Sequence, residues 1–133
     1  MTMCQPKRRE VLTLFGAAVT LGLLSHASYG ETAEMFGVIS KIKSVADQRD
    51  ALIAVLTEGT SAMPGCLSYV VARDAAEPNA IWVTEIWESR ERHQASLSLP
   101  SVQQAMAKGR PLIAGFAARF ETQPIGGQGV GAA

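Results

Sequence analysis

The chain is poor in the residue types that build the commonest catalytic and metal sites. Its 133 residues include two cysteines and two histidines. It has no paired Cys-x-x-Cys, no histidine cluster, no Gly-x-Gly-x-x-Gly after a strand-like run and no phosphate-binding loop. These absences predict a protein without a His-based metal site, a nucleotide site or any tightly bound cofactor of the usual kinds.

The N-terminus, residues 1–30, resembles an export signal. Arg8 and Arg9 stand just ahead of an apolar run, and small residues allow cleavage after Ala27 or after Gly30. An arginine pair before a moderately apolar segment resembles the twin-arginine signal, which exports folded proteins. The alternative is an uncleaved anchor, but the run is shorter than the roughly 20 residues that span a membrane. We expect a periplasmic or secreted protein that meets the membrane only during export.

Removal of residues 1–30 leaves a chain whose composition limits its partners. That segment holds three of the twelve basic and one of the twelve acidic side chains, so the remainder has a formal charge of −2. Such a chain does not attract nucleic acid electrostatically. Cys4 is lost with the segment, so Cys66 stands alone and no internal disulfide is possible. A domain of about 100 residues buries only a modest core by itself.

The centre of the chain predicts a β-hairpin. Residues 64–74 and 80–88 are rich in β-branched and aromatic side chains, with turn-forming residues between them. In the second run, strand periodicity places Ile81, Glu85 and Trp87 on one face. Both faces of this strand are mostly apolar, so we expect both to be covered, with the Glu85 carboxylate embedded in one of them.

A strand and a helix are predicted before the hairpin. Residues 35–42 read as a strand. Asp47 is a suitable N-cap for a helix whose apolar residues recur at helical spacing up to Met63, where Pro64 and Gly65 end it.

Two short helices are predicted after the hairpin. Ser89 is expected to cap the first, which Pro100 breaks. Ser101 with Gln104 resembles a capping box for the second, whose inward stripe includes Met106.

A last strand follows, in which Phe116, Ala118 and Phe120 alternate. The order β-α-β-β-α-β is that of a ferredoxin-like α+β fold, which we assign to residues 31–123. Helices would cover one face of a four-stranded antiparallel sheet, and a second copy must bury the other apolar face. The Gly-rich tail, 124–133, lacks a periodic pattern and is expected to be disordered.

Two strand motifs carry a family resemblance. A Gly-Cys-Leu-x-Tyr strand at residues 65–69 is followed by Glu-x-Trp-Glu at 85–88. This pair resembles the antibiotic biosynthesis monooxygenase family, which includes quinol monooxygenases, over roughly residues 35–122. The resemblance implies a dimeric α/β barrel, made by two sheets packed face to face. It also implies oxygenation of quinols or anthrones by dioxygen without metal or flavin.

The chain departs from the usual family pattern. That pattern places a histidine nine residues after the tryptophan, where this chain has Ser96, and often another after a proline, where it has Ser101. His93 stands where an apolar residue is more usual. Haem-degrading relatives need a tryptophan and an axial histidine at positions that fall on Ser96 and Met106, and an asparagine that the first strand lacks, so haem degradation is disfavoured.

A quinol-oxidising enzyme of this kind must bind an aromatic ring, take or share its phenolic proton and steady the resulting anion. His93 is the natural general base because its unperturbed pKa is about 6.5. Glu85 is a second candidate if burial raises its pKa. Candidates for an anionic oxygen are Arg73, Arg110 and Arg119. Candidates for the wall around the ring are Trp82, Trp87, Tyr69, Phe36, Met63, Met106 and Phe116.

Each candidate also has a structural interpretation. Glu85 can simply pair with Arg73 or Arg119, and the two tryptophans can be sheet core. His93 can be a hydrogen-bonded helix residue, and Cys66 a small buried strand residue. The sequence therefore predicts a cofactor-independent monooxygenase of quinol-like aromatics. The alternative is a non-catalytic dimer that binds a small molecule on the same scaffold.

Overall fold

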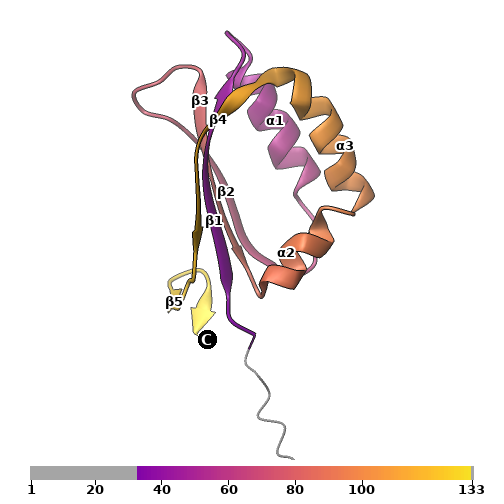
Figure 1. The fold of residues 1–133 in the computed structure, drawn as a ribbon, viewed down its shortest axis with the longest axis vertical. Helices are drawn as coiled ribbons and strands as arrows, with labels where there is room; N and C mark the ends of the chain where they lie inside the picture. The colour runs from indigo at the N-terminus through magenta and orange to yellow at the C-terminus, as the bar shows by residue number, and fades with distance from the viewer. Residues whose placement is uncertain (1–32, 133) are drawn as a thin grey trace, which may run out of the picture. The chain divides into compact units, whose positions relative to one another are not determined.

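The computed structural model describes residues 33–132 and shows a sheet with helices on one face only (Figure 1). The four-stranded sheet is antiparallel throughout and has the order β2-β3-β1-β4. Its elements are β1 (Phe36–Ser44), α1 (Arg49–Gly59), β2 (Cys66–Arg73), β3 (Ala80–Trp87), α2 (Arg90–Ser96), α3 (Pro100–Gly109), a 3₁₀ turn η1 (Arg110–Leu112) and β4 (Ile113–Thr122). The predicted ferredoxin-like fold is confirmed, with α2 and α3 together in the place of the second helix.

The predicted export signal lies outside the described residues. Within the described part of the chain, no helix is both long and apolar enough to cross a membrane.

The core lies between the sheet and the helices. Alternate residues of β1 face the helices, and their partners on β3 and β4 face the same way. One cluster of buried residues comprises Phe36, Val38, Met63, Trp87 and Val102. The other comprises Ile42, Leu52, Ile81 and Val83. The predicted alternation of β3 is therefore observed, with Ile81, Val83 and Trp87 inside.

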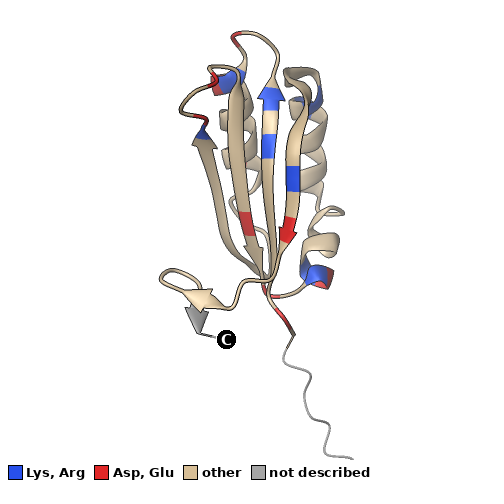
Figure 2. Cartoon of the chain, turned by 60° about the vertical axis from the view of Figure 1, so that its left-hand side comes forward, with Lys and Arg blue, Asp and Glu red and all other residues tan. Residues whose placement is uncertain are grey.

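The outer face of the sheet has no helix over it (Figure 2), and Lys41 and Lys43 are the charged residues that the strand register places on it. Register places Ile39, Val70, Trp82, Ile86 and Phe120 on this face. Val70 and Phe120 are 52% and 57% exposed. A single chain thus leaves this apolar face in water.

Helix α1 differs from the prediction at both ends. Asp47 has a φ of 62°, and Gln48 takes the N-cap position without a side-chain hydrogen bond, so the prediction of Asp47 as cap is wrong. The reason is a tertiary contact, since the Asp47 backbone N–H donates to Asn79 Oδ1 at 3.3 Å. The helix ends at Gly59, which packs so closely on Ala105 that a Cβ would not fit. Met63 lies beyond it and still reaches the core.

The two later helices begin at positions set by local chemistry. Ser89 caps α2 as predicted, because its Oγ accepts a hydrogen bond from the Arg92 backbone N–H at 3.2 Å. Helix α3 begins at Pro100, with Leu99 as N-cap, so the predicted capping box at Ser101 is wrong. Proline favours the first helical position, which places Ser101 inside the helix.

Strand β4 contains a register shift that re-aims one side chain. Lys41 pairs with Ala118, whereas Ile42 pairs with Phe116, so one extra residue lies in β4 between them. Phe116 therefore faces the helix side, while Ala118 and Phe120 face outward. The predicted alternation of these three residues on one face is broken by this bulge.

The C-terminal tail differs from the predicted disorder. Gly126–Gly127 (β5) pairs with Gly131–Ala132 (β6) as a short antiparallel hairpin. Gly126, Gly127 and Gly129 have positive φ, a conformation that glycine adopts at little cost. The hairpin depends on backbone freedom rather than on a hydrophobic pattern, which explains why periodicity does not predict it.

Candidate active site

The Glu85 carboxylate lies inside the layered core, on the helix-facing side of β3. Its cross-strand neighbours are Val38 on β1 and Tyr69 on β2. Its side chain is 14% exposed. Trp87 Nε1 donates a hydrogen bond to Glu85 Oε2 at 3.0 Å, because residues two apart on a strand share a face.

No arginine pairs with Glu85 among the described residues. Arg73 instead pairs with Asp50 at 2.9 Å, and Arg119 contacts Glu121. The structural ion pair considered for Glu85 is therefore absent from this part of the chain. The carboxylate keeps acceptor capacity beyond its bond from Trp87.

Helix α2 places the His93 imidazole beside this carboxylate. His93 Nε2 lies 3.9 Å from Glu85 Oε2, and its side chain is 12% exposed. The ring is held by aromatic neighbours, with its centroid 5.2 Å from that of Phe36 and 5.4 Å from that of Trp87. No described residue makes a hydrogen bond to its ring nitrogens, so a bound molecule has access to them as partners.

The surroundings of His93 favour its neutral form. Burial lowers the pKa of His93, and Arg119 and Arg90 lower it further, while Glu85 and Glu121 act in the opposite direction. A neutral imidazole near pH 7 can accept a proton. Glu85 can then stabilise the imidazolium that forms.

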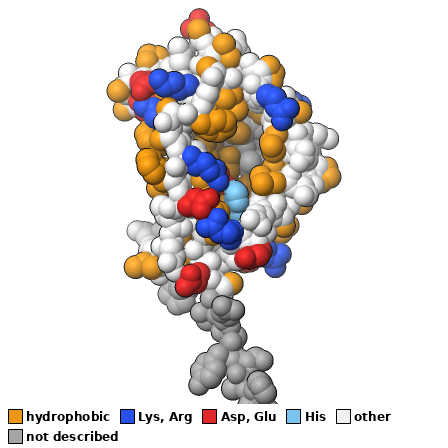
Figure 3. Space-filling model, in the orientation of Figure 1, with side chains coloured by type: hydrophobic (Ala, Val, Ile, Leu, Met, Phe, Trp, Pro, Cys, Tyr) orange, Lys and Arg blue, Asp and Glu red, His pale blue; other side chains and the backbone are white. Residues whose placement is uncertain are grey.

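A hollow lies next to these groups. Figure 3 shows it surrounded by hydrophobic side chains, with a histidine at its edge and charged side chains of both signs beside that histidine. The histidine is His93, since His26 lies outside the described residues. An apolar hollow with a few convergent polar groups is typical of a small-molecule site.

Arg90 and Glu121, which the sequence did not indicate as site residues, lie with Arg119 at the rim of the hollow. Arg90 Nη2 donates to Glu121 Oε2 at 2.9 Å, and the Arg90 guanidinium lies 4.2 Å above the centre of the Phe36 ring. Arg119 Nη2 is 3.9 Å from Glu121 Oε1. Arg90 is three residues before His93 on one helix, a spacing that could have revealed it. Glu121 depends on the register of β4, which has no local signal.

Tyr69 and Cys66 lie close to Glu85 and stay protonated. Burial, followed by the Glu85 charge, raises the pKa of the Tyr69 hydroxyl and that of the Cys66 thiol. Cys66 packs against the core cluster of Phe36 and Trp87, half-buried rather than fully buried. Both residues serve as neutral wall rather than as bases.

The structure gathers some of the predicted site residues and separates others. Those on the helix-facing side around Glu85 are His93, Trp87, Tyr69, Phe36, Met63 and Arg119. Arg73 pairs with α1, and Arg110 is exposed after α3. Met106 and Phe116 are 44% and 65% exposed. Trp82 lies on the opposite face of the sheet.

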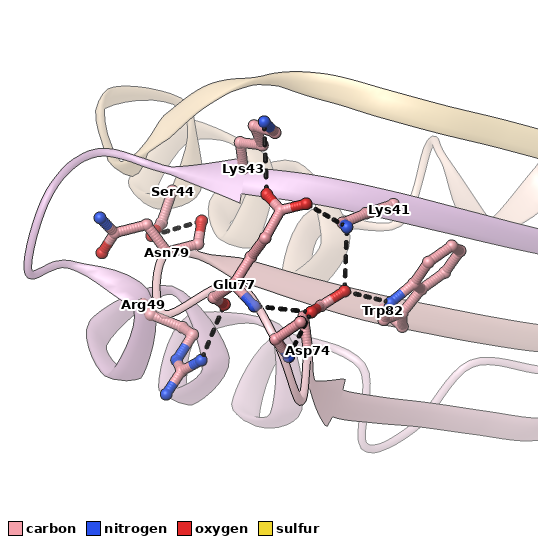
Figure 4. Close-up of polar contacts among 9 residues, drawn as sticks. Lys41, Lys43, Ser44, Arg49, Asp74, Glu77, Asn79 and Trp82 are labelled. Atoms are coloured by element: carbon pink, nitrogen blue, oxygen red, sulfur yellow. Dashed lines mark hydrogen bonds and ion pairs between the residues drawn. The ribbon is translucent and has the colours of Figure 1, made fainter.

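Trp82 belongs to a separate polar cluster at one end of the outer face (Figure 4). Its Nε1 donates to Asp74 Oδ2 at 2.7 Å. Lys41 Nζ contacts the same Asp74 oxygen at 3.0 Å and Glu77 at 2.6 Å. Asp74 Oδ1 accepts the backbone N–H groups of Ala76 and Glu77 at 2.9 and 2.8 Å. These donors hold the pKa of the Asp74 carboxyl far below its usual range.

Metal ligands do not gather in the described residues. No group of three or more His, Cys, Asp or Glu side chains there is placed to hold a metal ion.

Known proteins resemble this chain over most of its described length. The family model described as antibiotic biosynthesis monooxygenase matches residues 35–108. A solved structure from Chloroflexus aurantiacus that carries this family's name is 62% identical, with a TM-score of 0.71 over 73% of this chain and 99% of that one.

More distant solved structures share the fold alone. One from Pseudomonas aeruginosa is 15% identical, with a TM-score of 0.64 over 73% of this chain and 100% of its own. One from Nitrosomonas europaea, which also carries the family's name, is 15% identical, with a TM-score of 0.61 over 72% and 92%. No curated protein matches the chain.

Proposed function

Because the chain belongs to the antibiotic biosynthesis monooxygenase family, as its strand motifs predicted, we propose that it oxidises a hydroquinone or a similar electron-rich aromatic with dioxygen. The observation that carries this proposal is the Glu85–His93 pair, with 3.9 Å between Oε2 and Nε2, at the edge of an apolar hollow (Figure 3). A neutral base beside an aromatic-binding space is what the chemistry requires.

The reaction needs little from the protein beyond a proton acceptor. His93 takes the phenolic proton, and Glu85 stabilises the imidazolium. The phenolate then gives one electron to dioxygen, and the ring radical and superoxide combine to form a carbon–oxygen bond. The imidazolium returns its proton to the peroxide, and loss of water then leaves a hydroxyquinone. One oxygen atom ends on the ring and the other in water, and the ring supplies all the electrons, so no further reductant is required.

Oxygen consumption tests this proposal. Purified, metal-free protein is assayed against a panel of hydroquinones with an oxygen electrode. His93→Ala should lower kcat/KM by at least about tenfold, since a positioned general base contributes about 10²–10⁴-fold. The matched control is Gln94→Ala, which alters the next, exposed residue of α2. Full activity in His93→Ala would make Glu85 the leading base.

A binding role without catalysis is the second candidate. The separation of 3.9 Å between His93 Nε2 and Glu85 Oε2 is longer than a hydrogen bond, so the pair is not assembled as a proton relay in this state. A wild-type protein that binds a hydroquinone but never exceeds the uncatalysed oxidation rate would establish the binding role instead.

We also propose that two copies pack through the outer faces of their sheets. The apolar outer face supports this, because a monomer leaves Val70 and Phe120 more than half exposed. Light scattering at micromolar concentration should give a dimeric mass. A Phe120→Asp variant should shift it towards the monomer, and a monomeric wild type would contradict the proposal.

Export by a twin-arginine route is the remaining proposal. It rests on Arg8 and Arg9 ahead of the apolar run. Conversion of both to lysine should leave a larger precursor in the cytoplasm, detected by fractionation. Unchanged delivery of the double variant would rule this route out.

A further inference from the structure

The two arginines at the rim of the active site differ in what they already bind. Arg90 is engaged twice, by Glu121 at 2.9 Å and by the face of Phe36 at 4.2 Å. Arg119 reaches Glu121 only at 3.9 Å, beyond hydrogen-bond distance, and has no other ion pair among the described residues. Its guanidinium donors therefore remain available, and its side chain is 50% exposed.

The interior of the site holds the opposite charge. Glu85 accepts one hydrogen bond from Trp87 and meets no arginine or lysine within the described chain. Since Arg90 neutralises Glu121, the site is polarised, with an uncompensated carboxylate inside and an uncompensated guanidinium at the rim. A ligand with a hydroxyl donor at one end and an anion at the other complements both.

The geometry of the sheet sets the span between these two charges. Arg119 pairs with Ser40 and Glu85 pairs with Val38, so the two lie on the same face, two strands and two residues apart. Strand spacing and residue rise place their backbones about 12 Å from each other. The two side chains extend from the same face of the sheet, so one ligand that lies across β1 can contact both.

We propose that Arg119 selects aromatic substrates that carry a carboxylate, with the phenolic hydroxyl directed to Glu85 and His93 and the carboxylate to the rim. The planar guanidinium binds carboxylates in a bidentate manner, which fixes the ring's orientation as well as its affinity. This inference rests on the proposed function for its site, and it concerns which substrate that site prefers.

Equilibrium binding separates this preference from turnover. The probes are 4-hydroxybenzoate and 4-hydroxybenzamide, which both carry the phenol and differ in charge, and neither is a hydroquinone. By calorimetry, the carboxylate should bind about tenfold more tightly, the lower end for a charge-assisted hydrogen bond at a half-exposed site. Added salt should weaken the binding of 4-hydroxybenzoate and leave the binding of 4-hydroxybenzamide unchanged.

Two variants that remove charges of opposite sign should change carboxylate binding in opposite directions. Arg119→Gln should remove the preference and leave affinity for the amide unchanged. Glu121→Gln should strengthen binding of the carboxylate, because it removes the anion that competes for Arg119. The matched control, Arg110→Gln, changes an exposed arginine after α3 and should keep the wild-type preference. Equal binding of the two probes, binding of neither, or a preference that survives Arg119→Gln overturns the proposal.

Turnover completes the design. With 2,5-dihydroxybenzoate and methylhydroquinone as substrates, Arg119→Gln should raise KM for the carboxylated substrate relative to KM for methylhydroquinone. Oxidation of both with no preference would refute the role of Arg119 while the proposed function stands. Preferential binding of the carboxylate without any turnover would support the role of Arg119 and refute the proposed function.

Discussion

Two tryptophans of β3 each donate an indole N–H to a carboxylate, and the two carboxylates have different surroundings. Trp82 Nε1 donates to Asp74 at 2.7 Å on the outer face, and Trp87 Nε1 donates to Glu85 at 3.0 Å under the helices. Asp74 also receives Lys41 and two backbone N–H groups. Glu85 receives only Trp87 from the described residues, with His93 at 3.9 Å.

The difference distinguishes a carboxylate that orders a loop, Asp74, from one that can still accept hydrogen bonds from a ligand, Glu85. Asp74 has its acceptor positions filled by fixed donors, so it orders the loop between β2 and β3 and has little capacity for a ligand. Glu85 is largely enclosed as well, but among the described residues only Trp87 donates a hydrogen bond to it, and a neutral histidine stands beside it. Residual hydrogen-bonding capacity, rather than burial, thus identifies the site.

The largest expected effect concerns the two indoles themselves. Trp87 is 1% exposed within the core, so Trp87→Ala should lower the free energy of unfolding by about 3–5 kcal/mol. Trp82→Ala should cost less, because the Trp82 side chain stays partly exposed. Urea unfolding at one fixed protein concentration measures both. An equal loss in the two variants would contradict the comparison.

The two carboxylates should respond oppositely to neutralisation. Glu85→Gln keeps an acceptor for Trp87 but removes the charge beside His93, so we expect kcat/KM for hydroquinone oxidation to fall about 10²-fold with the melting temperature nearly unchanged. Asp74→Asn should lower the melting temperature and leave kcat/KM as in the wild type. Oxygen-electrode kinetics and calorimetry on both variants give the answer.

The helix that carries His93 depends on its cap. Ser89→Ala removes the Oγ that accepts the Arg92 N–H, which should cost about 1 kcal/mol of stability. Because the cap lies at the start of the short helix that positions His93, the proposed activity should fall together with the stability of α2. The control is Ser101→Ala, a serine inside α3 that does not cap a helix. If that control costs as much, the cap is not the cause.

The smallest expected effect is a pH dependence of stability. Because burial lowers the pKa of His93 below 6.5, the folded protein binds fewer protons than the unfolded chain between the two pKa values. The contribution of neutral His93 is therefore present above about pH 6.5 and is lost as the pH falls through the folded pKa. On acidification, the free energy of unfolding measured with urea should fall more for the wild type than for His93→Gln. Parallel curves would show that His93 does not titrate in this way.

Local patterns predicted the elements better than their ends. Alternation of apolar residues predicts β3 and its buried face, and Ser89 is a cap in both the pattern and the structure. Asp47 and Ser101 have the same capping chemistry but do not cap, because a contact to Asn79 and a proline at the first helical position decide those ends instead.

The candidate site was predictable where it depends on strand periodicity and not where it depends on register. Glu85 and Trp87 share a face because they are two residues apart. Trp82 could be placed on the other face of that strand by the same rule, but which face receives the helices has no local signal. Phe116 and Arg119 are placed by a bulge in β4, and one extra residue moves every side chain on one side of it to the opposite face.

The sequence by itself determined the β-α-β-β-α-β order, the hairpin with its embedded carboxylate and the family, because these follow from short-range periodicity and contiguous motifs. The tertiary structure alone decided that Glu85 meets His93 rather than an arginine. It also decided that Arg90 is held by Glu121 while Arg119 keeps its donors. These contacts join β3, α2 and β4 across the layers, and their geometry depends on helix packing and strand register that no local pattern encodes.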